Sequence, residues 1–551
     1  MSHRIKTFLD HTAYYFNGPL FITLLLGTGL FFTIYLRFPQ FRYFRRAFRM
    51  ILGKEPSTSQ EGDTSIVQAI ATSLASSIGA GCISGVCLAI HIGGPAAVFW
   101  MWVNTFLGMA TRMAEVAASH RYREKSEDGT MVGGPMYFMK NSLGMPWLGK
   151  IFAFGALFTT LLAGTLPQVN SMTKMLEPWN INKTVAGVII MLLVAVVVLG
   201  GIQRIGQVTE RLVPFMTLVY FGLVIFILSF QYDQLLSSLS AMFLHPFRTA
   251  PMIGGFLGAS LQTIVQQGIN WGFFTNDAGS GSVAIIHSSS KEQYSGKEGI
   301  MSMVEPFLSN CVCTLTALVI VSTGSYQDKV ETTFDRIDII VLQGNYRAHP
   351  KRLHAYVSDQ EKIPSFQGKL DVREGKIQNS EVTILHDACL AEEITLFTQG
   401  QHLFNGTLVI EGGKIRAPQH LHIRGKSTLS HAKLGRYTFG GAGNNPLGWL
   451  TKLLMVLCFL LFAFSTIVSY SYFGDRALIY LGGGRYLVIY RLLFVLFVFI
   501  GAVVEATIAW KSAVLSCAMM SLPNLISLLL RPSDIKETIE TQAGPKGKYK
   551  N

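Results

Sequence analysis

The sequence predicts an all-α polytopic membrane protein of about eleven transmembrane helices, with a small β-rich domain inserted outside the membrane. The 551 residues are 50% hydrophobic and only 14% charged, whereas about a quarter of the residues of an ordinary soluble domain carry charge. The apolar residues gather in charge-poor runs of about 20, the length that crosses a bilayer as a helix. One segment, residues 326–437, contains no such run. The aromatic content of 11% excludes a disordered chain.

The apolar runs define the order of spans and domains along the chain. The expected spans lie near residues 18–36, 64–90, 94–118, 147–173, 184–200, 209–230, 251–287, 300–322, 448–474, 486–504 and 506–530. We expect an extra N-terminal helix with a basic loop, a first five-helix repeat, the start of a second repeat, the insertion, the rest of the second repeat, and a tail. In that order, these domains cover residues 1–63, 64–250, 251–325, 326–437, 438–530 and 531–551.

The distribution of basic residues predicts the orientation, because cytoplasmic loops are enriched in Lys and Arg. The segment 37–63 is strongly basic, and every second loop after it is basic too, through Arg121, Arg123, Lys125, Lys140, Lys150, Arg204, Arg211, Lys291, Lys297, Arg476, Arg485 and Arg531. We therefore expect the N-terminus outside and the C-terminus in the cytoplasm, in a bacterial-type cytoplasmic (inner) membrane. The net charge of +13 is explained by this topology, and no motif suggests a nucleic-acid partner.

The segment 326–437 is predicted to be a soluble insertion on the outer face. Runs rich in Val, Ile and Leu predict strands at 339–342, 382–385 and 406–410, and Gly412-Gly413 predicts the turn that follows. Its 15 Lys and Arg nearly balance its 13 Asp and Glu. Seven of the chain's 13 histidines fall here, but without Cys partners or helical spacing they do not favour a zinc site.

Two glycine-rich interruptions mark the second and seventh spans. The first is Gly79-Ala80-Gly81-Cys82, and the second follows the segment Gly258 to Gly272 and runs from Phe273 to Ser282. Broken helices at corresponding positions of two halves form the substrate site of many transporters, because unpaired backbone survives at mid-membrane only where it lines a cavity. The alternative is that these glycines only permit close helix packing. The acidic Asp277 within a span favours a functional site.

Two adjacent hydroxyls in the ninth span, Ser465 and Thr466, suggest a cation site. Such hydroxyls usually donate to carbonyls of their own helix. The functional interpretation is that they ligate Na⁺ together with carbonyls of the first broken helix, since hard cations take oxygen ligands. Arg112 and Glu115 also fall in a span, where snorkelling or a structural ion pair is the simpler role. No nucleophile and base occur together, so we expect neither an enzyme nor a cofactor.

Several motifs resemble the alanine/glycine:cation symporter family, whose members are also called sodium:alanine symporters. They lie at residues 93–102, 133–137, 168–171, 312–320, 461–466 and 522–525. The resemblance covers almost everything outside the insertion. It implies a leucine-transporter-like fold with inverted five-helix repeats, and import of small neutral amino acids such as alanine and glycine coupled to Na⁺, or in some members to H⁺.

The resemblance also implies a site, position by position. Backbone N–H groups at the first break would receive the substrate carboxylate, and the second break and the fourth span would complete the pocket. The implied substrate-binding residues are Gly79, Ala80, Gly81, Gln168, Asn170, Asn276, Asp277 and Gly279. The implied Na⁺ ligands are the carbonyls of Ala75 and Ile78 and the hydroxyls of Ser465 and Thr466.

The chain departs from the family pattern at several positions. The family usually has Gly-Thr-Gly-Asn where Cys82 ends the first break, Glu where Asp277 stands, and Asp where Val514 stands. A thiol is a poor ligand for a hard cation, so Cys82 affects any second ion site. These departures and the insertion motivate an alternative function: a transporter-like receptor or interaction protein that acts through its exterior domain. The sequence leaves the oligomeric state open.

Overall fold

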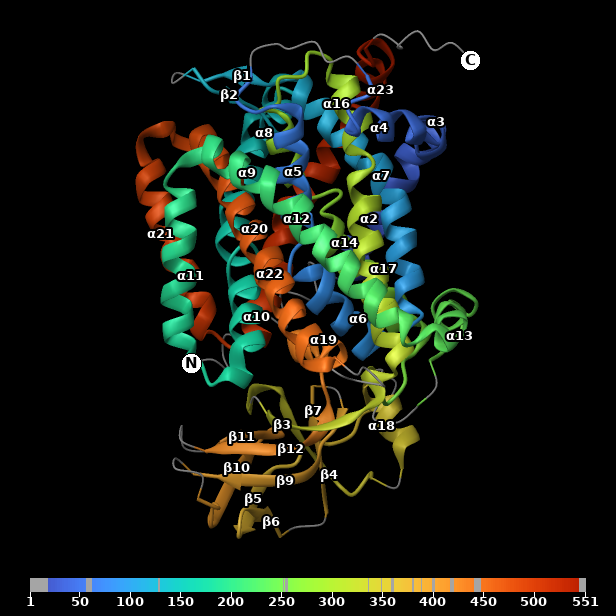
Figure 1. The fold of residues 1–551 in the computed structure, drawn as a ribbon, viewed down its shortest axis with the longest axis vertical. Helices are drawn as coiled ribbons and strands as arrows, with labels where there is room; N and C mark the ends of the chain where they lie inside the picture. Colours follow the sequence, from blue (N-terminus) through green and yellow to red (C-terminus); the bar gives the residue numbers. More distant parts are fainter. Residues whose placement is uncertain are drawn as a thin grey trace.

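A bundle of long helices forms the body of the molecule, and a domain of strands lies beyond one end of it (Figure 1). The computed structural model describes residues 18–55, 62–126, 129–250, 252, 256–334, 336–347, 349–357, 361–378, 381–387, 389–398, 402–416, 421–440 and 447–544. The C-terminal helix lies at the end of the bundle opposite the strands (Figure 1). The charge-rich segments predicted to be cytoplasmic, among them the C-terminal tail, therefore lie at the end of the molecule away from the strands.

The helices follow the order of the predicted spans. Those of the first half are α2 (Pro19–Tyr35), α3 (Pro39–Arg42), α4 (Phe44–Ile51), α5 (Ile66–Ser77), the π-helix η1 (Gly81–Gly85), α6 (Val86–Gly93), α7 (Ala97–Arg121), α8 (Pro135–Asn141), α9 (Pro146–Leu162), α10 (Leu166–Leu176), α11 (Lys183–Val198), α12 (Gly201–Ser229) and α13 (Tyr232–Phe243). Those of the second half are α14 (Leu261–Asn276), α15 (Ser282–His287), α16 (Ser295–Ser302), α17 (Glu305–Thr323), α18 (Pro350–Val357), α19 (His431–Phe439), α20 (Gly448–Gly482), α21 (Leu487–Val503), α22 (Ala506–Leu530) and α23 (Pro532–Thr541).

Six helical segments of the described chain are long and apolar enough to cross a membrane, and the bent pair α5–α6 makes a seventh when counted as one span. The six are 146–179, 201–229, 295–323, 448–482, 484–503 and 506–530. Two shorter apolar helices, 20–35 and 183–198, add to these. The chain is thus a multi-pass membrane protein. Every predicted span corresponds to one helix or to consecutive helices, while the count of eleven crossings stays a prediction.

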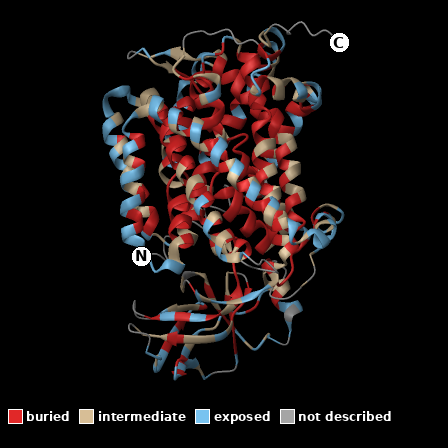
Figure 2. Ribbon diagram, in the orientation of Figure 1, coloured by how far each residue is buried: buried red, intermediate tan, exposed pale blue. Residues whose placement is uncertain are grey.

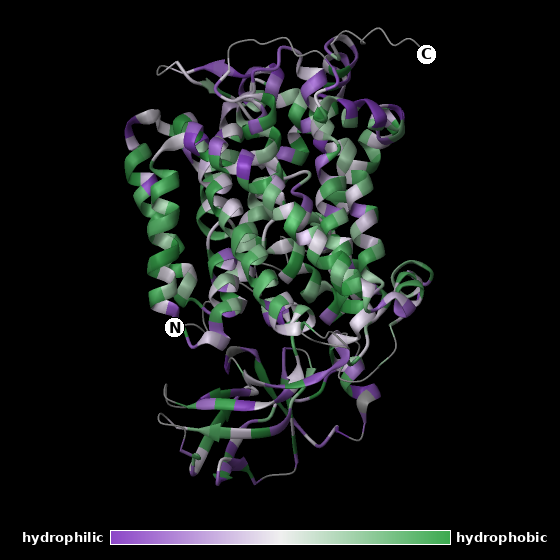
Figure 3. Cartoon of the chain, viewed as in Figure 1, coloured by the Kyte–Doolittle hydropathy of each residue, from purple (hydrophilic) through white to green (hydrophobic). Residues whose placement is uncertain are grey.

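The body presents apolar side chains to its surroundings as well as to its core. Figure 2 shows buried residues through the middle of the bundle and exposed ones on the outer helices. The exposed side chains include Leu192, Leu193 and Val196 of α11 and Leu492 and Leu496 of α21. Hydrophobic residues cover the length of the body, and hydrophilic ones collect at its ends and in the strand domain (Figure 3). An apolar exterior of this extent suits lipid rather than water.

The first predicted interruption is a real break. A capping box begins α5, in which Ser65 and Gln68 exchange side-chain and backbone hydrogen bonds. The helix ends at Ser77, and the following segment, Gly81–Gly93, is bent by 41° from it. Because η1 is a π-helix, each of its backbone hydrogen bonds spans one residue more than in an α-helix. This distortion is frequent at functional sites.

The second predicted interruption is also a break, between α14 and α15. Asp277 has φ +52° and ends the helix, and Gly279 and Gly281 have φ +93° and +79°. Residues with side chains rarely adopt these angles, whereas glycine does so at little cost. The sequence Asp277-Ala278-Gly279-Ser280-Gly281 therefore suits a non-helical connection inside the bundle.

Three small antiparallel sheets form the insertion. Their strand orders are β11-β10-β5-β6, β3-β12-β9 and β4-β7-β8. The strands are β3 (Lys329–Phe334), β4 (Ile339–Gln343), β5 (Gly368–Arg373), β6 (Lys376–Ile377), β7 (Val382–His386), β8 (Cys389–Leu390), β9 (Glu392–Phe397), β10 (Gly406–Glu411), β11 (Lys414–Arg416) and β12 (His422–Thr428). The three predicted strands are confirmed as β4, β7 and β10, and the predicted turn pairs Glu411 with Lys414.

The contact between α9 and α22 offers a test of the bundle packing. A Cβ built on Gly155 would lie 3.0 Å from the Cα of Met520, in the backbone of α22. We expect Gly155→Leu to destabilise the protein by roughly 1–3 kcal/mol, because the larger side chain must push α9 and α22 apart. The melting temperature of the purified protein in nanodiscs measures this. Gly222→Leu in α12 is the matched control, since open space surrounds that position, and equal melting temperatures would contradict the packing.

Candidate functional site

The first break lies against the fourth predicted span. The backbone N–H of Ala80 donates to Gln168 Oε1 of α10 at 3.0 Å. Gln168 therefore contacts one of the N–H groups that the sequence assigns to the substrate carboxylate. Asn170 of the same helix instead donates from Nδ2 to the carbonyl of Val504, 2.6 Å away, at the end of α21. The structure thus brings Gln168, but not the Asn170 amide, to the first break.

Thr466 reaches the first broken helix, as predicted for an ion ligand. Its Oγ1 donates to the carbonyl of Ala75 at 2.8 Å and to the carbonyl of Phe462 at 3.0 Å. A Cβ added at Gly79 would overlap this hydroxyl, so only glycine allows the approach. Ser465 donates to Phe462 of its own helix at 2.9 Å and faces Met216 of α12. Two of the four predicted Na⁺ ligands, Thr466 and Ala75, are therefore in direct contact.

A glutamate from α7 binds the backbone of the second break. Glu115 Oε2 accepts the N–H groups of Gly279 and Gly281, each at 3.2 Å. Asn524 of α22 donates from Nδ2 to the same oxygen at 3.0 Å and to the Gly279 carbonyl at 2.9 Å. Both polar backbone groups of Gly279 thus have side-chain partners in this conformation.

An arginine completes this network. Arg112 Nη2 donates to the carbonyl of Asn276 at 2.5 Å, and Nη1 lies 3.3 Å from Glu115 Oε1. Neither side chain of this ion pair is exposed. The Asn276 side chain accepts the N–H of Ala278 and donates to Thr105, and the Asp277 carboxylate accepts the Tyr470 hydroxyl at 3.2 Å. Of the two roles that the sequence left open for Arg112 and Glu115, snorkelling and a structural ion pair, the structure shows the ion pair, and its side chains also bind the backbone of the break.

The sequence did not identify Asn524 or Tyr470 as site residues. Asn524 lies in one of the family motifs, but the residues around it in the sequence do not indicate which group its side chain contacts. For Arg112 and Glu115 a signal existed, because a three-residue spacing places both on one face of a helix. Two charges on one face of an apolar helix indicate a shared polar partner, and here that partner is the interrupted backbone.

Aromatic rings and α19 cover the breaks on the side of the insertion. The ring of Phe274 lies 3.2 Å from the position of a Cβ on Gly81. Its centroid is 5.4 Å from that of Trp510, which also contacts the ring of His431 at the start of α19. Helix α19 itself packs on η1, α6 and α10. Among the described residues, α19 and the Phe274 ring therefore lie against the first break on this side.

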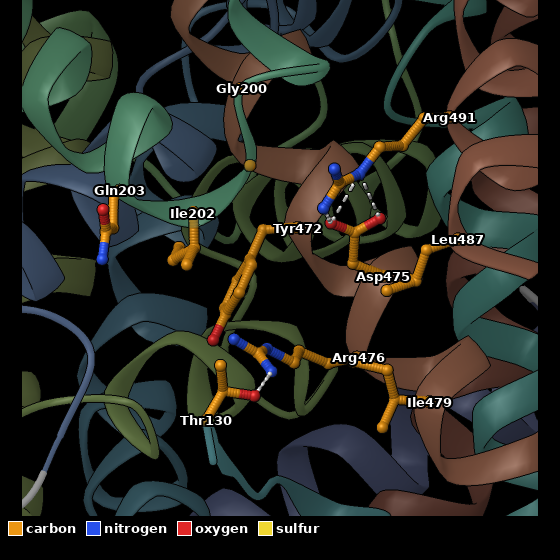
Figure 4. Close-up of a pocket in the computed structure, with 11 residues that line it drawn as sticks. Thr130, Gly200, Ile202, Gln203, Tyr472, Asp475, Arg476, Ile479, Leu487 and Arg491 are labelled. Carbon is orange, nitrogen blue, oxygen red and sulfur yellow. Dashed lines mark hydrogen bonds and ion pairs between the residues drawn. The ribbon is translucent and has the colours of Figure 1, made fainter. Parts of the chain in front are cut away.

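The opposite end of the broken helices is closed by polar contacts. Asp63, just before α5, pairs with Arg476 of α20 at 3.2 Å. The backbone of Thr64 pairs with that of Ser290, which follows α15. A cavity of about 230 Å³ lies beside Arg476, which donates to Thr130 on its wall (Figure 4). The cavity is lined by residues 200–203, α20 and α21, and it contains none of the predicted substrate or Na⁺ residues.

The insertion contacts the bundle at α6. His91 Nε2 of α6 lies 2.8 Å from the carbonyl of Asp387 and 3.7 Å from Cys389 Sγ. Burial works to raise the pKa of Asp387, but His431, His91 and His386 outweigh it and hold this pKa well below its usual range. The Asp387 carboxylate therefore stays ionised at neutral pH beside His431. Among the described residues, no three His, Cys, Asp or Glu side chains are placed to hold a metal ion.

Comparison with known proteins identifies the family of this chain. The model of the sodium:alanine symporter family matches residues 2–342 and 425–542. The chain belongs to the sodium:alanine symporter family. The match stops and resumes inside the insertion, so most of the strand domain lies outside what the family shares. Members of this family are transporters, and the protein is therefore a membrane transporter and not an enzyme.

Several relatives align along most of the chain. A Haemophilus influenzae protein named "Uncharacterized transporter" is 30% identical over 530 residues, covering 96% of this chain and 93% of the relative. The "Sodium/alanine symporter AgcS" of Methanococcus maripaludis is 30% identical over 519 residues, covering 93% and 92%. The "Uncharacterized transporter YflA" of Bacillus subtilis is 37% identical over 331 residues, which is 59% of this chain and 70% of the relative.

A solved structure supports the fold. The crystal structure of MhsT in complex with L-phenylalanine superposes with a TM-score of 0.51 at 11% identity, covering 87% of this chain and 93% of MhsT. At this identity the likeness concerns the fold alone. The expected inverted repeat of the symporter stays a prediction.

The Glu115 network can be tested through stability. We expect Glu115→Gln to destabilise the symporter by about 3–5 kcal/mol, because the buried Arg112 loses its counter-charge and two backbone N–H groups lose a charged acceptor. The melting temperature of the purified protein reports the change. Glu537→Gln is the control: its carboxylate pairs with Arg121 at 3.7 Å but is 63% exposed, so its loss costs about 1 kcal/mol or less. Similar melting temperatures for both variants would contradict the structural role of Glu115.

Proposed function

We propose that this symporter imports a small neutral amino acid, alanine or glycine, together with Na⁺. The observation that carries the proposal is the junction of Thr466, Ala75 and Gly79, where a hydroxyl of α20 meets a carbonyl of the first broken helix. Oxygen donors from two separate elements suit a hard cation. The family and the printed name of the AgcS relative support the same ion and substrate class.

The substrate would bind beside this junction. Backbone N–H groups at Gly79, Ala80 and Gly81 suit a carboxylate, because N–H groups at a helix break form a partial positive charge. Two of them have partners that a carboxylate would replace, the Ser77 carbonyl for Gly79 and Gln168 for Ala80. Gln168 accepts the Ala80 N–H in this conformation. A bound substrate carboxylate would either share this N–H with Gln168 or replace Gln168 as its acceptor. The Phe274 ring lies 3.2 Å from the position of a Cβ on Gly81 and packs against Trp510, so a substrate beside Gly81 would meet aromatic rings. These features favour alanine or glycine over larger amino acids.

Alternating access would use the two closures. The contact of α19 and the aromatic rings with the breaks must open for loading, and the Asp63–Arg476 pair must open for release. Coupling requires that Na⁺ and the substrate each bind one conformational state better than the other. The proposed orientation, with the N-terminus outside and the C-terminus in the cytoplasm, makes the insertion the outer end.

Transport in liposomes tests the coupling ion. We expect an inward Na⁺ gradient to accelerate uptake of labelled alanine or glycine by the reconstituted protein. Thr466→Ala should raise the Na⁺ concentration for half-maximal uptake by about tenfold or more, equivalent to ~1.4 kcal/mol of lost ligation, and Ser465→Ala should shift it in the same direction. Ser471→Ala is the control, because that hydroxyl donates only within α20.

Two results would contradict this proposal. Uptake that neither a Na⁺ gradient nor a proton gradient stimulates would exclude symport. An unchanged Na⁺ titration in Thr466→Ala would remove this residue from the ion site.

The insertion can be removed to separate transport from a receptor role. Lys329 and Thr428 are paired neighbours at its base, so a short Gly-Ser linker can replace residues 330–427 and leave α19 in place. We expect the shortened protein to retain Na⁺-dependent uptake, because, among the described residues, the first break packs against α19 rather than against the strands. Loss of uptake in a monodisperse sample would make the insertion part of the transport machinery. Absence of uptake in the intact protein would favour the receptor alternative.

A further inference from the structure

A buried histidine lies between two carboxylates outside the proposed substrate and Na⁺ sites. His287 ends α15, and its Nδ1 is 2.7 Å from Glu298 Oε1 of α16. Its Nε2 is 2.9 Å from Glu305 Oε1 at the start of α17. All three side chains are at most 1% exposed. We call these residues the His287 triad.

The contacts of the His287 triad require an extra proton. A neutral imidazole has one N–H and one bare nitrogen, and ionised carboxylates only accept hydrogen bonds. With a neutral ring and two carboxylates, one of the two contacts would therefore place lone pairs against each other in a dry interior. Both contacts become hydrogen bonds when the triad holds one more proton, either on the imidazole or on a carboxyl group. The closed arrangement is thus the proton-loaded one.

Nearby charged groups do not remove this requirement. His120 of α7 forms a hydrogen bond with Ser295. Arg123, just after α7, donates to the carbonyls of Ser288 and Ser290. Arg123 attracts Glu298 electrostatically without forming an ion pair with it. Lys297 of α16 pairs with Glu292 at 2.8 Å. From α5 the triad is faced by Ser73, which has no charge.

The His287 triad is linked to α5, the helix that leads into the first break. Ser73 of α5 donates from Oγ to Glu305 Oε2 at 2.5 Å. It stands two residues before Ala75, whose carbonyl accepts the Thr466 hydroxyl. When α5 leaves its position, Glu305 loses this donor and the triad loses the cover of α5. Water would then reach a group that is favourable only while it holds its proton.

We propose that the His287 triad is a proton-binding site that is loaded while α5 is packed against α17 and releases its proton to water when α5 moves away. Conversely, removing the proton favours the open position of α5, since linkage acts in both directions. As a step of the transport cycle this rests on the proposed symport, but the proton linkage of α5 is a property of the ligand-free protein. The ligand is a proton, and the carrier groups are one imidazole and two carboxyls.

Hydrogen exchange of the full-length protein in nanodiscs, without Na⁺ or amino acid, tests the linkage directly. We expect the protection of α5 peptides, after correction for the intrinsic rate, to fall by about tenfold as the pH rises from about 6 to about 9. In Glu298→Gln and Glu305→Gln, the amide N–H₂ can donate to a neutral imidazole without an extra proton. These variants should keep α5 protected at every pH. Glu124→Gln, which alters an exposed pair with Lys140, should retain the pH dependence of the unmodified protein.

The outcomes separate the triad from the transport proposal. Corrected protection of α5 that does not change with pH in the unmodified protein would overturn proton binding, as would pH dependence that persists in both Gln variants. If either Gln variant misfolds, the other and His287→Gln supply the comparison. Alanine uptake is measured in parallel. A pH-dependent α5 in a protein without uptake would overturn the symport and leave the proton site standing.

Discussion

The backbone groups exposed at two helix breaks are the constraint on which the rest of the structure depends. Inside a membrane protein, each N–H and C=O without a helical partner must find another, because water is not available to replace it. Glu115, Asn524 and Arg112 supply those partners at the second break. Gln168 does so at the first. The packing of α7, α10 and α22 around α5 and α14 is therefore set by hydrogen bonding as well as by apolar contact.

The same chemistry separates a rigid break from one able to bind a ligand. At the second break, the charged Glu115 accepts the amide of Gly279, the neutral Asn524 donates to the carbonyl of Gly279, and the charged Arg112 donates to the carbonyl of Asn276. The first break has weaker partners: a neutral amide on Ala80 and a hydroxyl on Ala75. A substrate carboxylate or a cation can replace such groups with less loss of free energy than it could replace an ion pair. This difference supports the proposal that the ligands bind at the first break.

The insertion joins a body of very different composition. Its strands bury their own small core. Its links to the bundle include polar contacts at α6 and α22, from His91 to Asp387 and from Thr507 to Asp338, and a small apolar cluster in which Leu257 joins side chains of the insertion. Interfaces of this kind are more polar than a domain core and allow relative motion. The family match covers residues 2–342 and resumes at residue 425, so α19 belongs to the shared body, and the strands from β5 to β11 are an addition to it.

The sequence alone determined the apolar spans, the two breaks, the strands at 339–342, 382–385 and 406–410, and the residue types suited to a cation or a carboxylate. Each of these is a local property that can be recognised from hydropathy, from the periodicity of the apolar residues or from a run of glycines. Only the tertiary structure decided that Glu115 meets Gly279 and Asn524, that Asn170 turns to Val504, and that His287 lies between Glu298 and Glu305. These pairings depend on where helices that are distant in sequence cross. A charged residue in an apolar helix indicates that a polar partner exists, but the sequence does not identify that partner.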